Sequence, residues 1–272
     1  MQLSLRNKII LLIGVLILIG IAFGVWRQKK KHVHDLPTII DTNRLTVVID
    51  SSSVGFSKDG NTVSGFQYEI VKTFADSLGV ELVVSQNNDF QSCVDGLQKG
   101  DFDIIASFIP PTMALQDNVI YSMPFFSSKQ VLVQACNSDS ANKDLITKHA
   151  QLAKCTIHIP SHSPYKMRIQ HLSDEIADTI IINELNNKSA EQLVRAVSKG
   201  EIKYTICDEL LAKKLKLKYT NIDVNLAIGF SHQMCWGVHP KSPLLLEKLN
   251  AFLDEFIGSS EYWKLYRKYY GL

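Results

Sequence analysis

GFQYEIVKTFADSLGVELVV (Gly65–Val84) is the stretch that decides the fold of this chain. Apolar residues recur at four-residue spacing from Phe66 to Leu78, which predicts an amphipathic helix, and Gly79 is a typical residue to end it. The run ELVVS (Glu81–Ser85) is short and β-branched, as expected for a strand. The stretch therefore predicts a helix that leads directly into a strand.

The flanking residues extend this pattern on both sides. LTVVID (Leu45–Asp50) precedes it and FDIIASF (Phe102–Phe108) follows it, and both are typical of buried parallel strands. Between them, Val94 and Leu97 mark a second helix that Gly100 ends, and Asp59-Gly60 is a hairpin signal. The order β-α-β-α-β predicts an open parallel sheet.

A second series of the same kind follows a strand expected at Val131–Ala135. Its predicted elements are a strand at Cys155–Pro160, a helix with Ser163 as N-cap and Pro164 as its first residue, a strand at Thr179–Ile182, a helix around Ala190–Val197 and a strand at Tyr204–Cys207. Strand-like Ala227–Val238 and helical Leu244–Leu272 close the chain. Two such series predict an α/β fold of two lobes, with ligand bound at the carboxyl ends of the strands.

The N-terminus carries an apolar run of 18 uncharged residues, Ile9–Trp26. A helix of this length spans roughly 27 Å, close to the core of a bilayer, so we expect a transmembrane anchor. A cleaved signal ending near Ala22–Gly24 is the alternative, and residues 32–43 are expected to be a linker. The basic residues around the run slightly favour a cytoplasmic C-terminus, but the predicted fold favours a body on the periplasmic side.

The distribution of charge argues against nucleic acid as a partner. Residues 1–35 carry a net charge of +5, whereas the remainder has 23 basic and 26 acidic residues. A mildly acidic body lacks the concentrated basic face that phosphate binding requires. We therefore expect the basic residues near the apolar run to meet lipid headgroups instead.

Cysteine and histidine spacing does not predict a metal site. The five cysteines are widely separated and form no CxxC pair, and His158, His162 and His171 lack ligand spacing. Buried free thiols are expected, with one disulfide, Cys136–Cys155, left open for an exported chain.

Several motifs in order carry a family resemblance. With the opening stretch, LQKGDFDIIAS (97–107) and YSMPF (121–125) make the chain resemble bacterial solute-binding protein family 3. GEIKYTICD (200–208) and its spacing to Met234–Trp236 are similar to the ligand-binding module that precedes the catalytic domain of membrane-bound lytic transglycosylases. We expect no counterpart of that catalytic domain here, and therefore none of its activity.

The resemblance implies a two-lobed periplasmic-binding-protein fold of type 2. It places lobe 1 at residues 44–131 and 230–272, and lobe 2 at residues 132–229, after an N-terminal anchor or signal segment at residues 1–35. Amino-acid-binding members hold the ligand carboxylate with an arginine, and Leu115 stands at that position in this sequence. A ligand-contacting threonine is replaced by Pro110, and a covering aromatic residue by Ser53. Free α-amino acids are therefore not the expected ligands.

Other family positions are retained. The resemblance implies that Asp208 receives a ligand ammonium group and that Ser163 binds anionic groups at a helix N-terminus. It also places these further candidates in the cleft: Asp50, Phe56, Phe90, Phe108, Pro110, Thr112 and Tyr165. Each has a structural alternative, because the acids and Ser163 could simply cap helices or turns and the aromatic residues could be packing.

We therefore expect a non-catalytic protein of the cytoplasmic (inner) membrane, with one span and a periplasmic binding domain that needs no cofactor. Its ligand would be a muropeptide, a peptide or an amino-acid-like solute, held between the lobes for an ABC permease or for a membrane sensor. Two alternatives remain open. One is a dehydratase-like enzyme using Asp208 or Glu209, and the other is a ligand-free interaction scaffold.

Overall fold

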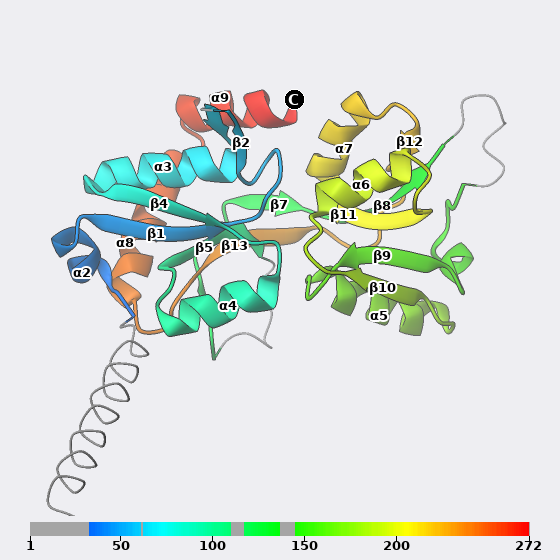
Figure 1. Ribbon diagram of the computed structural model, residues 1–272, viewed down its shortest axis with the longest axis horizontal. Coiled ribbons are helices and arrows are strands. Elements are labelled where there is room, and N and C mark those ends of the chain that lie inside the picture. Colours follow the sequence, from blue (N-terminus) through cyan, green and yellow to red (C-terminus); the bar gives the residue numbers. More distant parts are fainter. Residues whose placement is uncertain (1–32, 61, 110–116, 137–144, 272) are drawn as a thin grey trace, which may run out of the picture.

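The computed structural model describes residues 33–60, 62–109, 117–136 and 145–271. Within them the chain forms two lobes that lie side by side, each built on its own β-sheet with helices on both faces (Figure 1). The predicted α/β organisation into two sheet-based lobes is confirmed by this arrangement.

The first lobe contains a mixed sheet in the order β4-β1-β5-β13-β6, with β7 paired to β13. β1 runs parallel to β4 and β5, whereas β13 runs antiparallel to β5. Its strands are β1 (Arg44–Ile49), β4 (Glu81–Gln86), β5 (Ile104–Ile109), β6 (Ile120–Tyr121), β7 (Phe126–Ser128) and β13 (His232–Val238). Its helices are α2 (Leu36–Asp41), α3 (Phe66–Leu78), α4 (Phe90–Lys99), α8 (Pro243–Phe256) and α9 (Ser260–Tyr270).

The second lobe contains a sheet in the order β10-β9-β11-β8-β12. β9 runs parallel to β10 and β11, and β8 runs antiparallel to β11 and β12. Its elements are β8 (Gln130–Ala135), η2 (His149–Leu152), β9 (Thr156–Pro160), α5 (Tyr165–Ile176), β10 (Ile181–Leu185), α6 (Ala190–Ser198), β11 (Tyr204–Asp208), α7 (Glu209–Lys218) and β12 (Ile222–Asp223). A hairpin of β2 (Ser57–Asp59) and β3 (Thr62–Ser64) projects from lobe 1 at the predicted turn.

Local sequence signals set several boundaries correctly. Gly79 and Gly100 adopt left-handed angles, with φ of 70° and 73°, and end α3 and α4 as predicted. A side chain at either position would be strained, because residues other than glycine rarely adopt positive φ. These two ends were predictable because the signal lies in a single residue.

The predicted linker at residues 32–43 is wrong in its central part. The short helix α2 occupies that segment and buries Ile39 completely. The Asp35 carboxylate accepts hydrogen bonds from the N–H groups of Leu36 and Leu245, each at 2.8 Å, so it caps α2 and also holds the start of α8. This helix depends on a contact with a segment about two hundred residues away, which is why its own few residues did not reveal it.

Three other predicted boundaries also differ from the structure. α5 begins at Tyr165 with Pro164 as its N-cap, so Ser163 is not the cap and makes no capping hydrogen bond. The strand expected at Thr179–Ile182 runs from Ile181 to Leu185, and the strand expected from Ala227 begins at His232. The residues before His232 instead cross between the lobes beside β8, with the N–H of Ile228 donating to the carbonyl of Gln130.

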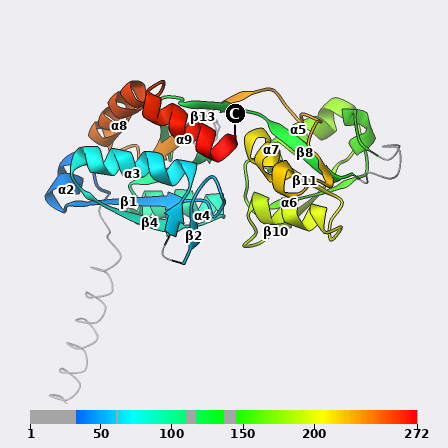
Figure 2. The ribbon, with the colours of Figure 1, turned by 90° about the horizontal axis from the view of Figure 1, so that it is seen from above.

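The two lobes share one continuous hydrophobic core. Buried residues of α7, such as Leu211 and Leu215, belong to the same cluster as Tyr269 and Tyr270 of α9. Both ribbon views show the C-terminal end of α9 beside α7 (Figures 1 and 2). The C-terminal helix of lobe 1 therefore supports the lobe 2 helix that begins at Asp208.

No helix among the described residues is long and apolar enough to cross a membrane. The run Ile9–Trp26, for which an anchor is predicted, lies outside those residues.

Candidate functional site

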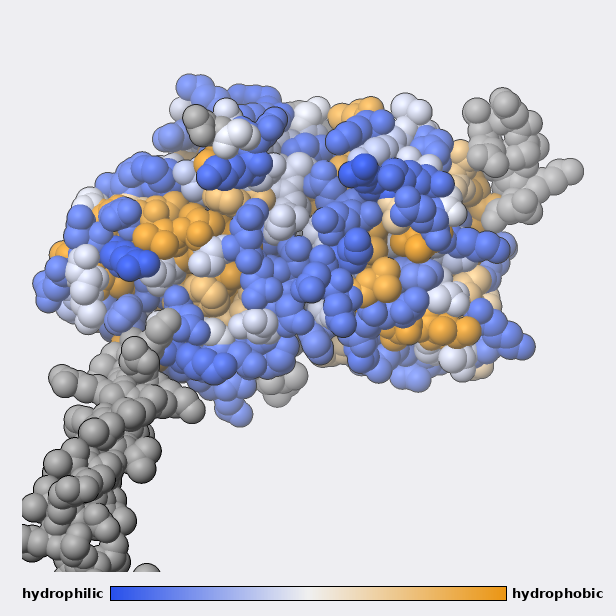
Figure 3. Space-filling view, in the orientation of Figure 1, coloured by the Kyte–Doolittle hydropathy of each residue, from blue (hydrophilic) through white to orange (hydrophobic). Residues whose placement is uncertain are grey.

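A cavity of about 140 Å³ lies between the lobes, at the carboxyl ends of the sheet strands. The outer surface along the junction of the lobes is mostly hydrophilic on the face seen in Figure 3. Lobe 1 contributes Asp50, Ser52, Val54, Asn87, Asn88, Phe90, Cys93, Ser107 and Met234. Lobe 2 contributes Gln130, Pro160, Ser163, Pro164, Tyr165, Ser189, Ala190, Asp208 and Leu211.

Asp50 follows β1 and organises a tight loop in the lobe 1 wall. Its Oδ2 accepts a hydrogen bond from the Ser52 hydroxyl at 2.6 Å, and its N–H donates to Ser107 Oγ at 3.2 Å. Gly55 is required beside it, because a Cβ there would lie 2.5 Å from Asp50 Oδ2. The residue is only half-buried, but the surrounding wall keeps bulk water from the carboxyl, and this desolvation raises the pKa of Asp50.

Asp208 ends β11 and caps α7, and both of its alternative roles have a structural basis. Its Oδ1 accepts from the N–H groups of Leu210 and Leu211 at 3.0 and 3.3 Å. Its Oδ2 is buried and has no hydrogen-bond partner. Burial raises the pKa of Asp208 to about 6; the nearby Ser128 hydroxyl and the helix N–H groups work in the opposite direction. The Ser128 hydroxyl is itself without a hydrogen-bond partner, so we take its effect on the carboxyl to be weak.

Two further oxygens in the lobe 2 wall have no partner. Gln130 lies directly across from Asp208 in the β8–β11 pair, so the two side chains project from the same face of the sheet. Both residues are more than nine-tenths buried, at 6% and 8% exposure, and Gln130 Oε1 makes no hydrogen bond. Ser163 Oγ is likewise buried without a partner. A polar atom left unpaired in a protein wall is costly, which points to a missing ligand.

Phe90 and Tyr165 also line the cavity, from lobe 1 and lobe 2 respectively. Burial raises the pKa of the Tyr165 hydroxyl well above its usual value, and the neighbouring Cys207 and Asp208 add to this effect. The Cys93 thiol in the opposite wall is held neutral, because burial raises its pKa to about 12. The cavity therefore presents a phenol and a thiol that stay protonated at neutral pH.

Two predicted site residues do not line this cavity. Phe56 packs edge-to-face on Tyr68, with ring centroids 5.2 Å apart. Ser53 lies at the lobe junction, where its N–H donates to Glu191 Oε2 at 2.7 Å and its carbonyl accepts from Lys214 Nζ at 3.1 Å. A ligand role for either residue stays a prediction.

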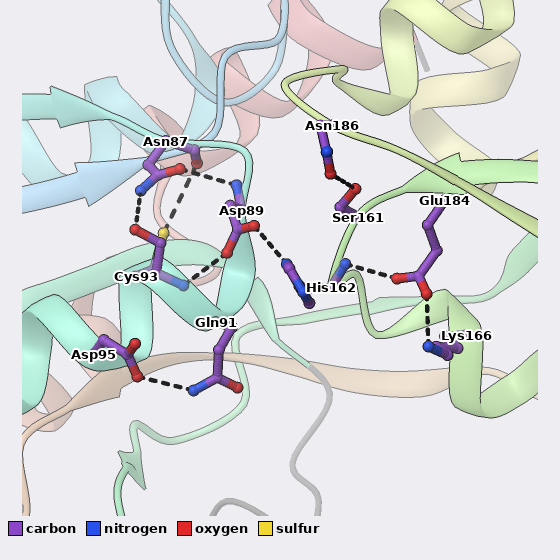
Figure 4. A network of polar contacts seen from close by, with 11 residues as sticks. Asn87, Asp89, Gln91, Cys93, Asp95, Ser161, His162, Lys166, Glu184 and Asn186 are labelled. Carbon is purple, nitrogen blue, oxygen red and sulfur yellow. Dashed lines mark hydrogen bonds and ion pairs between the residues drawn. The ribbon is translucent and has the colours of Figure 1, made fainter.

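A second contact between the lobes closes another side of the junction. His162 Nδ1 lies 2.6 Å from Asp89 Oδ2, and the His162 N–H donates to Glu184 at 2.9 Å (Figure 4). Asp89 also caps α4 through Ser92. The described part of the chain is therefore closed around the cavity by its own side chains.

Other predicted residues cannot be placed in the cavity. Pro110 and Thr112 lie outside the described residues, as does Leu115, and of Phe108 only its position in β5 is described. Among the described residues no group of three or more His, Cys, Asp or Glu side chains is placed to hold a metal ion, and all five cysteines are free.

The sequence reasoning missed several residues of the cavity wall, including Asn87, Asn88, Ser107, Gln130 and Ser189. Asn87 and Asn88 directly follow the predicted second strand, and Ser189 begins a capping box on α6. Those signals place residues at strand ends and helix starts, where clefts form. Gln130 had no such signal, because its role depends on pairing with a strand far along the chain.

Comparison with known proteins places this geometry in a family. The chain is 26% identical over 270 residues to a membrane-bound lytic murein transglycosylase F of Desulfosudis oleivorans, covering 99% of this chain and 58% of that protein. It is 27% identical over 232 residues to the protein of the same name from Pseudomonas fluorescens, covering 84% of this chain and 46% of that protein. The chain thus spans about half the length of these relatives, as expected for their binding module.

Solved structures share the fold. An ancestral amino acid-binding protein, described as a precursor of cyclohexadienyl dehydratase, superimposes with a TM-score of 0.73 at 20% identity, covering 86% of this chain and 99% of that one. A solute receptor for L-cysteine from Neisseria gonorrhoeae gives a TM-score of 0.74 at 16% identity, covering 87% and 93%. These likenesses confirm the two-lobed periplasmic-binding fold. The model of the bacterial extracellular solute-binding proteins, family 3, matches residues 45–272, and the chain belongs to that family.

Proposed function

We propose that this protein is a membrane-anchored, extracytoplasmic solute-binding protein that captures a small ligand between its two lobes. The observation that carries the proposal is a cavity lined by both lobes in which Asp208 Oδ2, Gln130 Oε1 and Ser163 Oγ have no partner. A ligand that pairs these oxygens would bind the closed form more tightly than the open form, which is the condition for ligand-driven closure.

The direct test is to identify what the protein carries. The full 272-residue chain, purified in detergent from cells, should release a bound solute that native mass spectrometry detects. Thermal-shift screening with peptidoglycan fragments, short peptides and amino acids should raise Tm for the matching class. Absence of any carried solute together with no shift in Tm would favour a scaffold role instead.

Localisation and partners form part of the same proposal. Anchoring by Ile9–Trp26 would hold the lobes at the outer face of the cytoplasmic membrane, where captured ligand is handed to an ABC permease or reported to a membrane sensor. Alkaline phosphatase fused after Leu272 should be active, because that enzyme matures outside the cytoplasm. An inactive fusion that is made at normal levels would contradict the orientation.

One observation supports a second candidate function. Asp208 is a cavity carboxyl whose pKa is raised to about 6, as in many general acids and bases. A dehydratase-like reaction on a small organic acid would use it in that role. If so, Asp208→Asn should abolish turnover of such acids and keep their binding.

A further inference from the structure

We infer that the cavity selects a solute that carries a protonated primary amine and has no free carboxylate. This inference rests on the proposed function and names the ligand class of the same site. It departs from free amino acids, whose carboxylate needs a receptor of its own.

The unpaired atoms in the wall are hydrogen-bond acceptors. Asp208 Oδ2 and Gln130 Oε1 can only accept, and the Ser163 hydroxyl can accept as well as donate. A primary ammonium group has three N–H donors and no acceptor, so three such oxygens match its bonding capacity. Because Gln130 and Asp208 are cross-strand partners, at least two of the three are neighbours on one sheet face.

The charges around the cavity point the same way. Asp50 and Asp208 both line it, and Glu191 lies close enough to raise the pKa of Asp50 further. No Lys, Arg or His is among the described residues that line the cavity. The nearest described cation at the junction, Lys214, is already engaged with the Ser53 carbonyl and with the Tyr269 ring at 5.1 Å from its centroid.

The sequence beyond the described lining supplies no cation either. Residues 108–119 contain no Lys, Arg or His, and the position expected to hold a carboxylate-binding arginine is Leu115. A ligand carboxylate would therefore enter an acidic cavity without a counter-ion, which is strongly unfavourable.

One feature of the cavity favours negative charge, and it is too weak to reverse the balance. α5 begins at the cavity with no side-chain cap, and a helix N-terminus carries roughly half a positive charge. This partial charge suits the carbonyl oxygen of an amide. Next to two carboxylates it does not compensate a full ligand carboxylate.

The size of the cavity sets the probe. A cavity of about 140 Å³ is close to the roughly 150 Å³ that accommodates benzene, which has about six heavy atoms. L-Alaninamide, L-alanine, L-lactamide and L-lactate are of this size and nearly identical in shape. They differ in whether they carry an ammonium group, a carboxylate, neither or both.

Isothermal titration of the four solutes into the full chain at neutral pH tests the inference. Alaninamide should bind about tenfold or more tightly than each of the others, since a hydrogen bond to a charged group contributes about 1.5–3 kcal/mol. Asp208→Asn should remove that preference while keeping the cap on α7. Asp223→Asn, which neutralises a buried carboxyl of the same sheet outside the cavity, should retain it.

Equal or tighter binding of alanine, lactate or lactamide would overturn the inference, as would no measurable binding of alaninamide. Survival of the preference in Asp208→Asn would do the same. A co-purified solute with a free carboxylate would also overturn it, and that result would leave solute capture itself supported. The two proposals can therefore fail separately.

Discussion

The two lobes contribute different kinds of wall to the cavity. In lobe 1 the main polar groups are bonded within the lobe: Ser52 donates to Asp50, and Asn88 Oδ1 accepts from the N–H of Ser51 at 2.8 Å. In lobe 2, Asp208 Oδ2, Gln130 Oε1 and Ser163 Oγ have no partner. Lobe 1 is thus complete without a ligand, whereas lobe 2 retains unpaired groups whose cost a ligand would relieve.

The largest expected effect on stability comes from neutralising the unpaired acid of lobe 2. Asp208→Asn keeps an oxygen that can cap α7 and removes a buried charge. The native pKa is about 6 and the model value is 3.8, a difference of about two units, so the variant should be more stable at about pH 7.5 by roughly 2–3 kcal/mol. Chemical denaturation measures this difference.

The pH dependence of that gain follows from the sign of the shift. Between about pH 4 and pH 6 the unfolded chain loses the Asp208 proton and the native chain keeps it, so wild-type stability falls as pH rises through this window. Below about pH 4 the variant and the wild type should be equally stable, because both states are protonated there. A loss of stability in Asp208→Asn at neutral pH would show that Oδ2 has a partner after all.

A matched pair of serines sharpens the comparison. Ser52 Oγ donates to Asp50 and accepts from the Gly55 N–H at 2.8 Å, so Ser52→Ala should lower the free energy of unfolding by about 1–3 kcal/mol. Ser163→Ala removes an oxygen without a partner and should change stability by less than about 0.5 kcal/mol. Equal losses in the two variants would break the contrast between the lobes.

The contacts that Ser53 makes across the junction should have a smaller effect. Glu191→Ala and Lys214→Met each remove one of its two hydrogen bonds to lobe 2. Without a ligand, either change should shift the lobes towards the open form, seen as a larger radius of gyration in X-ray scattering. Lys199→Met, on the surface of lobe 2, is the control and should leave the radius unchanged.

The smallest effect is expected from the exposed pair of His162 and Asp89. The hydrogen bond to Asp89 raises the pKa of His162. Desolvation opposes ionisation of Asp89, but the Ser92 N–H and His162 outweigh it and lower the pKa of Asp89. The pair holds the lobes together between these two pKa values and weakens as pH rises through that of His162. The scattering radius should therefore increase slightly in the alkaline direction, and His162→Ala should remove that slope.

Much of the fold was predictable because its signals are local. The spacing from Phe66 to Leu78 and the glycines at 79 and 100 gave the helices of lobe 1 and their ends, since periodicity and positive φ act within a few residues. α2 was missed because a helix of six residues is stable only through Asp35 and the burial of Ile39.

For the site, the sequence by itself determined which residues end strands and begin helices, and so named Asp50, Phe90, Ser163, Tyr165 and Asp208, all of which line the cavity. Only the tertiary structure decided which of their atoms are free. Asp208 divides its two oxygens between α7 and the cavity, Gln130 reaches the cavity through its pairing with β11, and Ser53 bonds to the opposite lobe. The physical reason is that a polar atom's partners, and the burial that shifts its pKa, come from segments far away in the chain.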